Sequence, residues 1–177
     1  MFFKFQRTLK IILTILVFTT INACDKSTEP EPKEQPQKLK LYINEFMASN
    51  KSTIADEKNQ YDDWFELYNG EDTTINLSLF YLTDDFNKKN KWRMPNFNLQ
   101  PKSWILIWCD EDSAQGILHS NFKLSAAGEQ LGIFSLSLKA IDTITYGPQK
   151  TDTSFGRFPD GADFWKFMQP TPNNPNK

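Results

Sequence analysis

The sequence predicts an all-β fold, an antiparallel β-sandwich, for the chain from residue 40 onward. Short stretches in which apolar and polar residues alternate recur from Leu39, as in half-buried strands. Turn-forming pairs such as Asn69-Gly70 and Asp160-Gly161 separate these stretches. No stretch keeps the 3.6-residue periodicity of an amphipathic helix, and residues 112–118 could form one helical turn at most. Seven or eight short strands in about 140 residues are typical of a sandwich.

The first predicted strand covers residues 41–46, where Leu41, Ile43 and Glu45 alternate with the residues between them. Because successive side chains of a strand point to opposite faces, these three are expected to share one face. The other predicted strands cover residues 63–68, 75–83, 91–94, 103–109, 130–136, 139–146 and 154–158.

The second predicted strand combines an apolar face with a carboxylate. Phe65 and Leu67 share one face, and Glu66 lies on the other face between two aromatic residues. A carboxylate in such surroundings needs a partner, because burying an unpaired charge is costly. We expect Arg157 or Arg93 to supply that partner in a structural ion pair.

The fifth predicted strand ends at a cysteine. Ile105, Ile107 and Cys109 share one of its faces, so Cys109 is expected to behave as a small buried hydrophobic residue. A reactive thiolate would need a cationic neighbour, whereas Asp110 and Glu111 follow directly.

The N-terminus resembles a bacterial lipoprotein leader. Three basic residues precede an apolar run over residues 11–21, which is too short to cross a hydrocarbon core. Ile21-Asn22-Ala23-Cys24 then resembles a lipobox, the motif in which the cysteine is lipidated. We therefore expect residues 1–23 to be a lipoprotein signal peptide and Cys24 to carry the lipid. The alternative is an ordinary signal peptide, or an uncleaved anchor, with an incidental cysteine.

A linker is predicted between this leader and the folded domain. Residues 25–38 contain three prolines, charges of both signs and no large apolar residue. Such a composition cannot bury enough surface to fold and favours an extended spacer. Residues 24–39 are therefore predicted to be a lipid-anchored, disordered linker, and residues 40–177 the sandwich domain.

The charge and the cysteine count exclude some classes of function. Removal of residues 1–23 would leave 17 Lys and Arg against 22 Asp and Glu. An acidic surface opposes binding to a phosphate backbone, so no nucleic-acid partner is expected. If Cys24 carries lipid, Cys109 has no partner for a disulfide, and the domain must be stabilised by its packed core.

Several blocks of residues resemble the lamin-tail domain family, in its bacterial secreted lipoprotein branch. The most distinctive block is His119–Ser125 followed by Gly128-Glu129, and the resemblance covers residues 41–175. The other blocks are Ile43–Asn50, Asp63–Asn69, Leu82–Asp85, Trp92–Pro95, Ile107–Asp110, Asp142 with Tyr146-Gly147, Ser154–Gly161 and Pro170–Pro172.

The resemblance implies an immunoglobulin-like β-sandwich and gives no catalytic residues to transfer. Bacterial members look like non-catalytic modules of exported proteins, and nuclear relatives act in protein–protein contacts. The expected function is therefore that of a membrane-anchored, non-catalytic module at the outer membrane or cell surface. It would bind a protein or an envelope component such as a glycan.

Acidic and aromatic side chains are the candidate ligand-binding groups. Several carboxylates fall at strand ends or on polar faces, where strand pairing could gather oxygen ligands for Ca²⁺. No contiguous calcium-binding loop is present, so solvated carboxylates are the default interpretation. Two tryptophans are expected to be partly exposed and could stack on a sugar. The candidates are Glu45, Asp63, Glu66, Asp84, Trp92 and Trp165.

These candidates support an alternative function, a carbohydrate- or Ca²⁺-dependent ligand-binding module. An enzyme is not expected, because both a nucleophilic triad and a histidine-bearing zinc site would have to use His119, the only histidine. We expect His119 to be a structural residue that bonds a nearby loop. No cofactor and no metal-ligand set are predicted, apart from the possible Ca²⁺.

Overall fold

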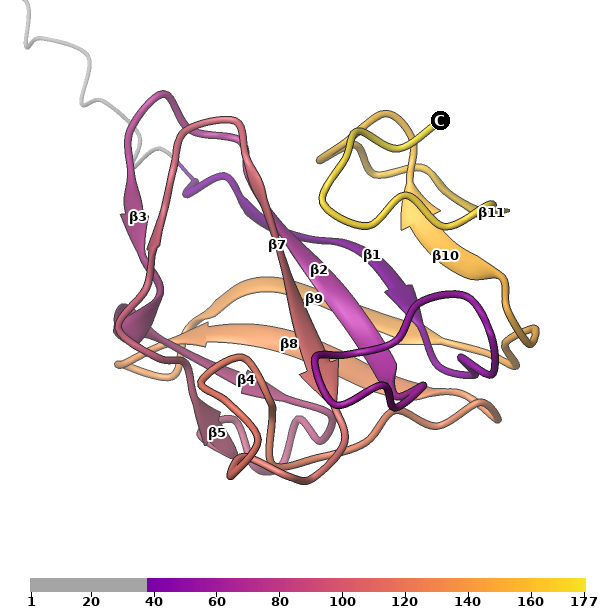
Figure 1. Ribbon diagram of the computed structural model, residues 1–177. Helices are drawn as coiled ribbons and strands as arrows, with labels where there is room; N and C mark the ends of the chain where they lie inside the picture. The colour runs from indigo at the N-terminus through magenta and orange to yellow at the C-terminus, as the bar shows by residue number, and fades with distance from the viewer. Residues whose placement is uncertain (1–37) are drawn as a thin grey trace, which may run out of the picture. The chain divides into compact units, whose positions relative to one another are not determined.

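The main layer of the domain is a five-stranded antiparallel sheet (Figure 1). The computed structural model describes residues 38–177, so the predicted signal peptide, Cys24 and nearly all of the predicted linker lie outside the described residues. The strands, in spatial order, are β11 (Trp165–Met168), β10 (Ser154–Arg157), β1 (Leu41–Met47), β2 (Asp63–Asn69) and β7 (Trp104–Cys109).

A four-stranded antiparallel sheet forms the second layer. Its strands, in spatial order, are β5 (Trp92–Arg93), β4 (Phe80–Thr83), β8 (Glu129–Ser135) and β9 (Ala140–Tyr146). β8 and β9 contact β1 of the first sheet. Figure 1 shows these two strands crossing behind β2 and β7. The all-β antiparallel sandwich predicted from the sequence is therefore confirmed.

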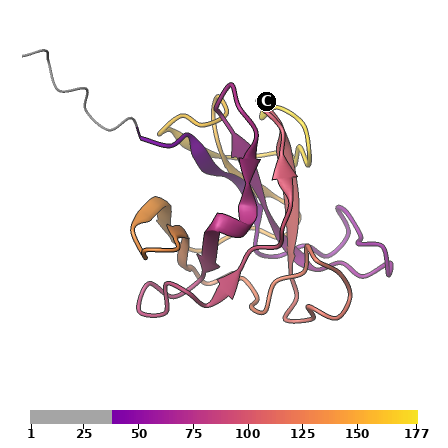
Figure 2. The ribbon, with the colours of Figure 1, turned by 90° about the vertical axis from the view of Figure 1, so that its left-hand side faces the viewer.

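A short two-stranded ladder completes the fold. It pairs β3 (Ile75–Asn76) with β6 (Asn98–Leu99), and Figure 2 shows β3 on the side that faces the viewer. The predicted strand over residues 75–83 is divided by the 3-10 turn η1 (Leu77–Leu79). Asn76 accepts a hydrogen bond from the Ser78 N–H, which caps this turn. Within residues 38–177, no helix is long and apolar enough to cross a membrane.

The hydrophobic core lies between the two main sheets. It contains Phe65, Leu67, Ile107 and Cys109, which confirms the predicted apolar faces of β2 and β7. The other fully or nearly fully buried members include Leu41, Ile43, Phe46, Leu77, Leu82, Met94, Leu99, Phe122, Leu131, Ile133 and Tyr146.

A β-bulge in β1 changes the face of every following residue. The register against β2 shifts between Ile43 and Glu45, so Asn44 is an extra residue in the strand. Phe46 and Ile43 therefore both lie on the core face, and Glu45 lies opposite Glu66 on the other face. The expectation that Glu45 shares a face with Ile43 is wrong, because strict alternation does not hold across a bulge.

The outer face of the five-stranded sheet carries a second apolar cluster. Met47, Trp64, Leu106 and Trp108 are buried there, and Ile54 packs against them. A sheet face is normally buried only when another part of the chain covers it. Here residues of the β1–β2 loop, to which Ile54 belongs, supply part of that cover.

Candidate functional site

Glu45 and Glu66 lie side by side beneath the C-terminal segment that follows β11. They are directly opposite in the β1–β2 register, and both are fully buried. Glu45 accepts hydrogen bonds from the Thr171 N–H at 3.0 Å and from the Thr171 hydroxyl at 2.8 Å. Glu66 accepts one from the Asn173 N–H, and the Asn44 amide lies 3.4 Å away. The two carboxylates thus anchor this segment to the sheet.

Burial favours the neutral form of both groups. It raises the pKa of Glu66 to about 8, although the Asn173 N–H opposes the change, and it also raises the pKa of Glu45.

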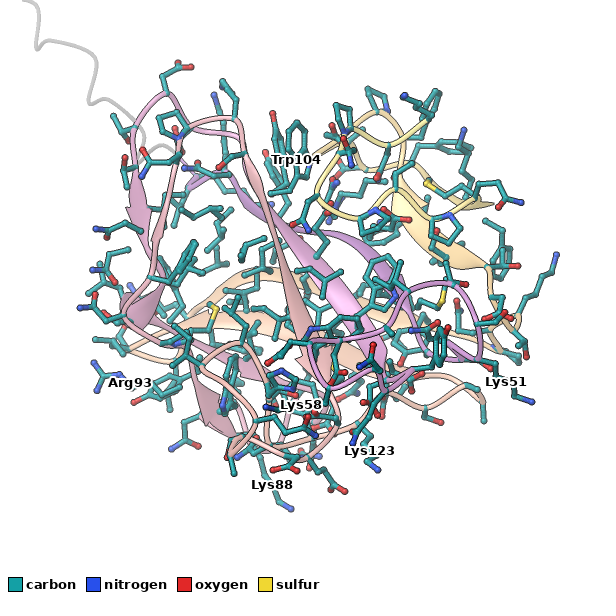
Figure 3. All side chains as sticks on the ribbon, in the orientation of Figure 1. Lys51, Lys58, Lys88, Arg93, Trp104 and Lys123 are labelled. Atoms are coloured by element: carbon teal, nitrogen blue, oxygen red, sulfur yellow. The ribbon has the colours of Figure 1, made fainter. Side chains whose placement is uncertain are left out.

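The expectation that Arg157 or Arg93 forms an ion pair with Glu66 is wrong. The Arg93 guanidinium donates to the Ser78 carbonyl at the periphery of the molecule (Figure 3).

Arg157 instead pairs with Asp142. Its guanidinium donates to both carboxylate oxygens at 2.9 Å and to the Ile43 carbonyl. The cation also lies 4.7 Å from the centre of the Trp165 ring. These groups border a cavity of about 420 Å³, whose lining includes Lys38, Asp142, Thr143, Arg157, Asp163 and Trp165.

The other predicted site residues lie on separate elements. Asp63 begins β2 and accepts a hydrogen bond from the Asn50 N–H, while burial raises its pKa to about 6. Asp84 forms an ion pair with Lys91 at 2.7 Å. Trp92, in β5, is half-buried and packs against the core. Of the six predicted candidates, the structure joins only Glu45 and Glu66 by direct strand pairing.

His119 connects two loops at one end of the sandwich. Its Nδ1 lies 2.6 Å from Asp110 Oδ2, and its Nε2 lies 3.1 Å from Glu57 Oε1. The ring also stacks on Trp108. Burial lowers the pKa of His119, but the two carboxylates outweigh this effect and raise the pKa above its usual value. His119 therefore bonds nearby loops, as expected, although the contribution of Glu57 was not foreseen.

Exposed aromatic side chains surround β11, the outermost strand of the five-stranded sheet. Phe158, Phe164 and Phe167 are exposed, and Phe164 has 62% of its surface accessible. Lys166 Nζ lies over the Phe158 ring and Lys150 Nζ over the Phe167 ring. Beyond β11, no strand pairs with this edge among residues 38–177.

This aromatic edge was missed in the sequence, although a signal was present. Five aromatic residues fall within residues 155–167. One short strand cannot direct all five side chains into the core, so some of them must lie on the surface. β11 itself was not among the predicted strands.

Comparisons with known proteins identify one match. A family model described as Lamin Tail Domain matches residues 34–148. No curated protein and no solved structure matches the chain. The matched range includes most of the motif blocks named above, whereas the blocks from Ser154 onward lie beyond it.

Proposed function

The chain belongs to the lamin tail domain family, and we propose that it is a non-catalytic module that binds a partner protein along β11. In this proposal a lipid on Cys24 holds the module at the cell envelope, at the outer membrane or the cell surface. A single observation carries the binding role: the open strand edge of β11 is flanked by exposed phenylalanines. Clustered exposed apolar side chains are typical of interaction sites.

The proposed occupant is an extended segment of the partner protein. Such a segment adds to a sheet edge through main-chain hydrogen bonds, and its side chains enter neighbouring hollows. A cavity of about 260 Å³ lies beside the edge, lined in part by Tyr146, Pro148, Phe155 and Phe167. It suits an apolar side chain, because three aromatic rings and Pro148 supply more of its lining than the polar Thr145 and Gln149.

The charge near the edge indicates further features of the partner. Lys150 and Lys166 lie close to the exposed rings, and neither forms an ion pair among the described residues. Carboxylates in the bound segment would meet these two cations. The proposed partner segment is therefore extended, apolar at alternate positions and acidic between them.

Affinity capture from cross-linked envelope extracts tests the binding role. The double variant Phe164→Ser/Phe167→Ser is expected to lose a partner protein that the wild-type chain captures. Leu79→Ser is the matched control, since Leu79 is a comparably exposed apolar residue in η1, with 52% of its surface accessible. Equal capture by all three proteins would contradict the proposed surface.

The lipid anchor is tested separately. Cys24→Ser is expected to move the chain from the membrane fraction to the soluble fraction, because the acyl chains supply the attachment. An unchanged membrane fraction would contradict lipid anchoring, and it would leave the role of β11 unaffected.

Carbohydrate binding is a second candidate, favoured by the polar cavity beside Trp165. This cavity combines an aromatic ring with the charged groups of Lys38, Asp142, Arg157 and Asp163. Glycan-array binding that Trp165→Ala abolishes and Trp92→Ala retains would support this candidate. Absence of binding by the wild-type chain would remove it.

A further inference from the structure

Three potential metal ligands meet where two loops cross at the end of β7. Asp56 belongs to the β1–β2 loop, and Asp110 and His119 belong to the segment after β7. One ligand atom from each residue lies within 4.8 Å of the other two, and all three side chains are buried. In the sequence, the strands from β2 to β7 lie between Asp56 and the other two residues, Asp110 and His119. The fold is therefore what brings the three together.

An oxygen of Asp56 is left without a partner. Asp56 is only 7% exposed. Its Oδ1 accepts hydrogen bonds from the N–H groups of Lys58 and Gln60, both at 2.8 Å. Its Oδ2 is buried and has no hydrogen-bond partner among residues 38–177. Buried polar atoms are normally paired, so the unpaired oxygen of Asp56, in a residue grouped with two further potential ligands, points to a ligand for this group.

The surrounding charge supports the same conclusion. Asp62, which follows in the same loop, also has a buried Oδ2 without a partner among the described residues. Lys58 and Lys123 lie at this end of the molecule (Figure 3), but neither forms an ion pair with these carboxylates in the part of the chain that the structure describes. Lys123 pairs with Asp110 through an isolated β-bridge, but among the described residues only His119 forms an ion pair with the Asp110 carboxylate.

We propose that Asp56, Asp110 and His119 form a binding site for a divalent transition-metal ion of the Zn²⁺ class. One imidazole nitrogen with two carboxylates is a mixed donor set of the kind that Zn²⁺ accepts. Ca²⁺ and Mg²⁺ bind through oxygen ligands, so the histidine disfavours them. Three protein ligands leave a fourth tetrahedral position for water or another ligand.

The two nitrogens of His119 have different roles in this site. Nδ1 faces Asp110 at 2.6 Å and is the proposed metal ligand. When the ion binds, the hydrogen bond between Nδ1 and Asp110 breaks, the two atoms move apart to ligate the ion, and the Nδ1 proton leaves to solvent. Nε2 faces Glu57, which lies outside the group of three ligands. Nε2 donates its hydrogen to Glu57, and this contact orients the ring as outer carboxylates do for metal-bound histidines. Glu57 is therefore a positioning residue.

The bound ion would fasten the β1–β2 loop to the segment after β7. Residues of that loop help to cover the apolar cluster on the outer face of the five-stranded sheet, because Ile54 packs against this cluster. Metal binding is thus expected to stabilise this cover in the native state and to raise the melting temperature.

Zn²⁺ titration of the full chain, purified in mild detergent and stripped of metal, tests the site. Calorimetry is expected to show one Zn²⁺ per chain and a higher melting temperature when the ion is present. Co²⁺ is expected to give the visible absorption of a four-coordinate site. Ca²⁺ is expected to change neither the heat signal nor the melting temperature.

Asp56→Asn separates a metal role from a structural role. The asparagine carbonyl can still accept from Lys58 and Gln60, and its amino group replaces the orphaned oxygen. The metal-free variant is therefore expected to melt at or above the temperature of the metal-free wild type while its Zn²⁺ affinity falls by at least about tenfold. His119→Gln is expected to lose Zn²⁺ binding as well.

Two milder variants complete the test. Glu57→Gln is expected to retain binding with an affinity reduced by about ten- to a hundredfold. Asp112→Asn is the matched control, because Asp112 is an exposed carboxylate in the same loop as Asp110 and lies outside the ligand group. Failure of the wild type to bind Zn²⁺, or equal binding by wild type and Asp56→Asn, would overturn the proposal.

Discussion

Glu66 shows how one residue links the sheet to the C-terminal segment. Its sequence position between two aromatic residues indicates that it needs a partner, and the structure supplies the Asn173 N–H. The predicted arginine partner is wrong for a physical reason. Any backbone N–H can satisfy a carboxylate, and the Pro170–Pro172 block in this segment does not indicate which residue of the sheet its N–H groups reach. The position of Asp56 beside His119 was likewise not predictable from the sequence, because it depends on loop geometry alone.

The first prediction concerns the pH dependence of stability. The pKa of Glu66 is about 8 in the folded chain, against an ordinary 4.5. Below pH 4.5 the group is protonated in both states and contributes nothing to the pH dependence. Between pH 4.5 and about pH 8 Glu66 loses its proton in the unfolded chain and keeps it in the folded chain. The free energy of unfolding therefore falls as the pH rises through this range. The loss reaches up to about 5 kcal/mol at pH 8.

Glu66→Gln is expected to remove this contribution. Its carbonyl can still accept from Asn173, and only the weak 3.4 Å contact with Asn44 is lost. Denaturant titrations at several pH values should therefore show a flatter profile for the variant than for the wild type. Glu111→Gln, an exposed control, should reproduce the wild-type slope. Parallel profiles for wild type and Glu66→Gln would contradict the raised pKa.

Strands of six or seven residues were predictable from the sequence, and irregular or very short elements were not. β2, β7, β8 and β9 lie close to their predicted ranges because each is a run rich in β-branched and aromatic residues that turn signals bound. The bulge at Asn44 was not foreseen, since an extra residue leaves no mark on composition. β6 and β11 were missed, because strands of two and four residues depend on pairing with β3 and β10 more than on a local pattern.

The second prediction concerns the C-terminal segment as an element of the fold. Thr171→Val removes the hydroxyl that lies 2.8 Å from Glu45 Oε2 and keeps the side-chain shape. The buried acceptor loses a partner, so the free energy of unfolding should fall by about 1–2 kcal/mol in a urea titration. Thr151→Val removes an exposed hydroxyl that bonds Ser49 and should have little effect. Equal stability of all three chains would contradict a stabilising contribution of the Thr171 hydroxyl, while the Thr171 N–H would still donate to Glu45.

At the scale of the whole molecule, the sandwich depends on residues beyond the matched family range. The match ends at residue 148, yet β10 pairs with β1 and extends the five-stranded sheet. Arg157 of β10 also neutralises the buried Asp142 of β9. The all-β class was predictable from turns and alternation, whereas this connection between distant segments depends on long-range packing that a local pattern does not encode.

The third prediction follows from that dependence. A chain ending at residue 148 exposes the edge of β1 and leaves Asp142 without its cation. Removing one partner of a buried ion pair is strongly destabilising, by about 3–5 kcal/mol. Circular dichroism should therefore show no cooperative thermal transition. The full-length chain is the control. A chain ending at residue 169 keeps β10 and β11 and should retain a cooperative transition at a lower temperature than the full-length chain, because it lacks the Thr171 and Asn173 partners of Glu45 and Glu66. A cooperative transition at the wild-type temperature in the shorter chain would contradict this account.

The central claim is that β11 is the surface on which a partner protein docks, and site-specific photo-cross-linking in living cells tests it most directly. A photoreactive amino acid at position 164 should yield a discrete product with a partner protein, because Phe164 flanks the open strand edge. The same group at position 79, a comparably exposed site in η1, should yield none. No product at position 164, or the same product at both positions, would contradict the claim.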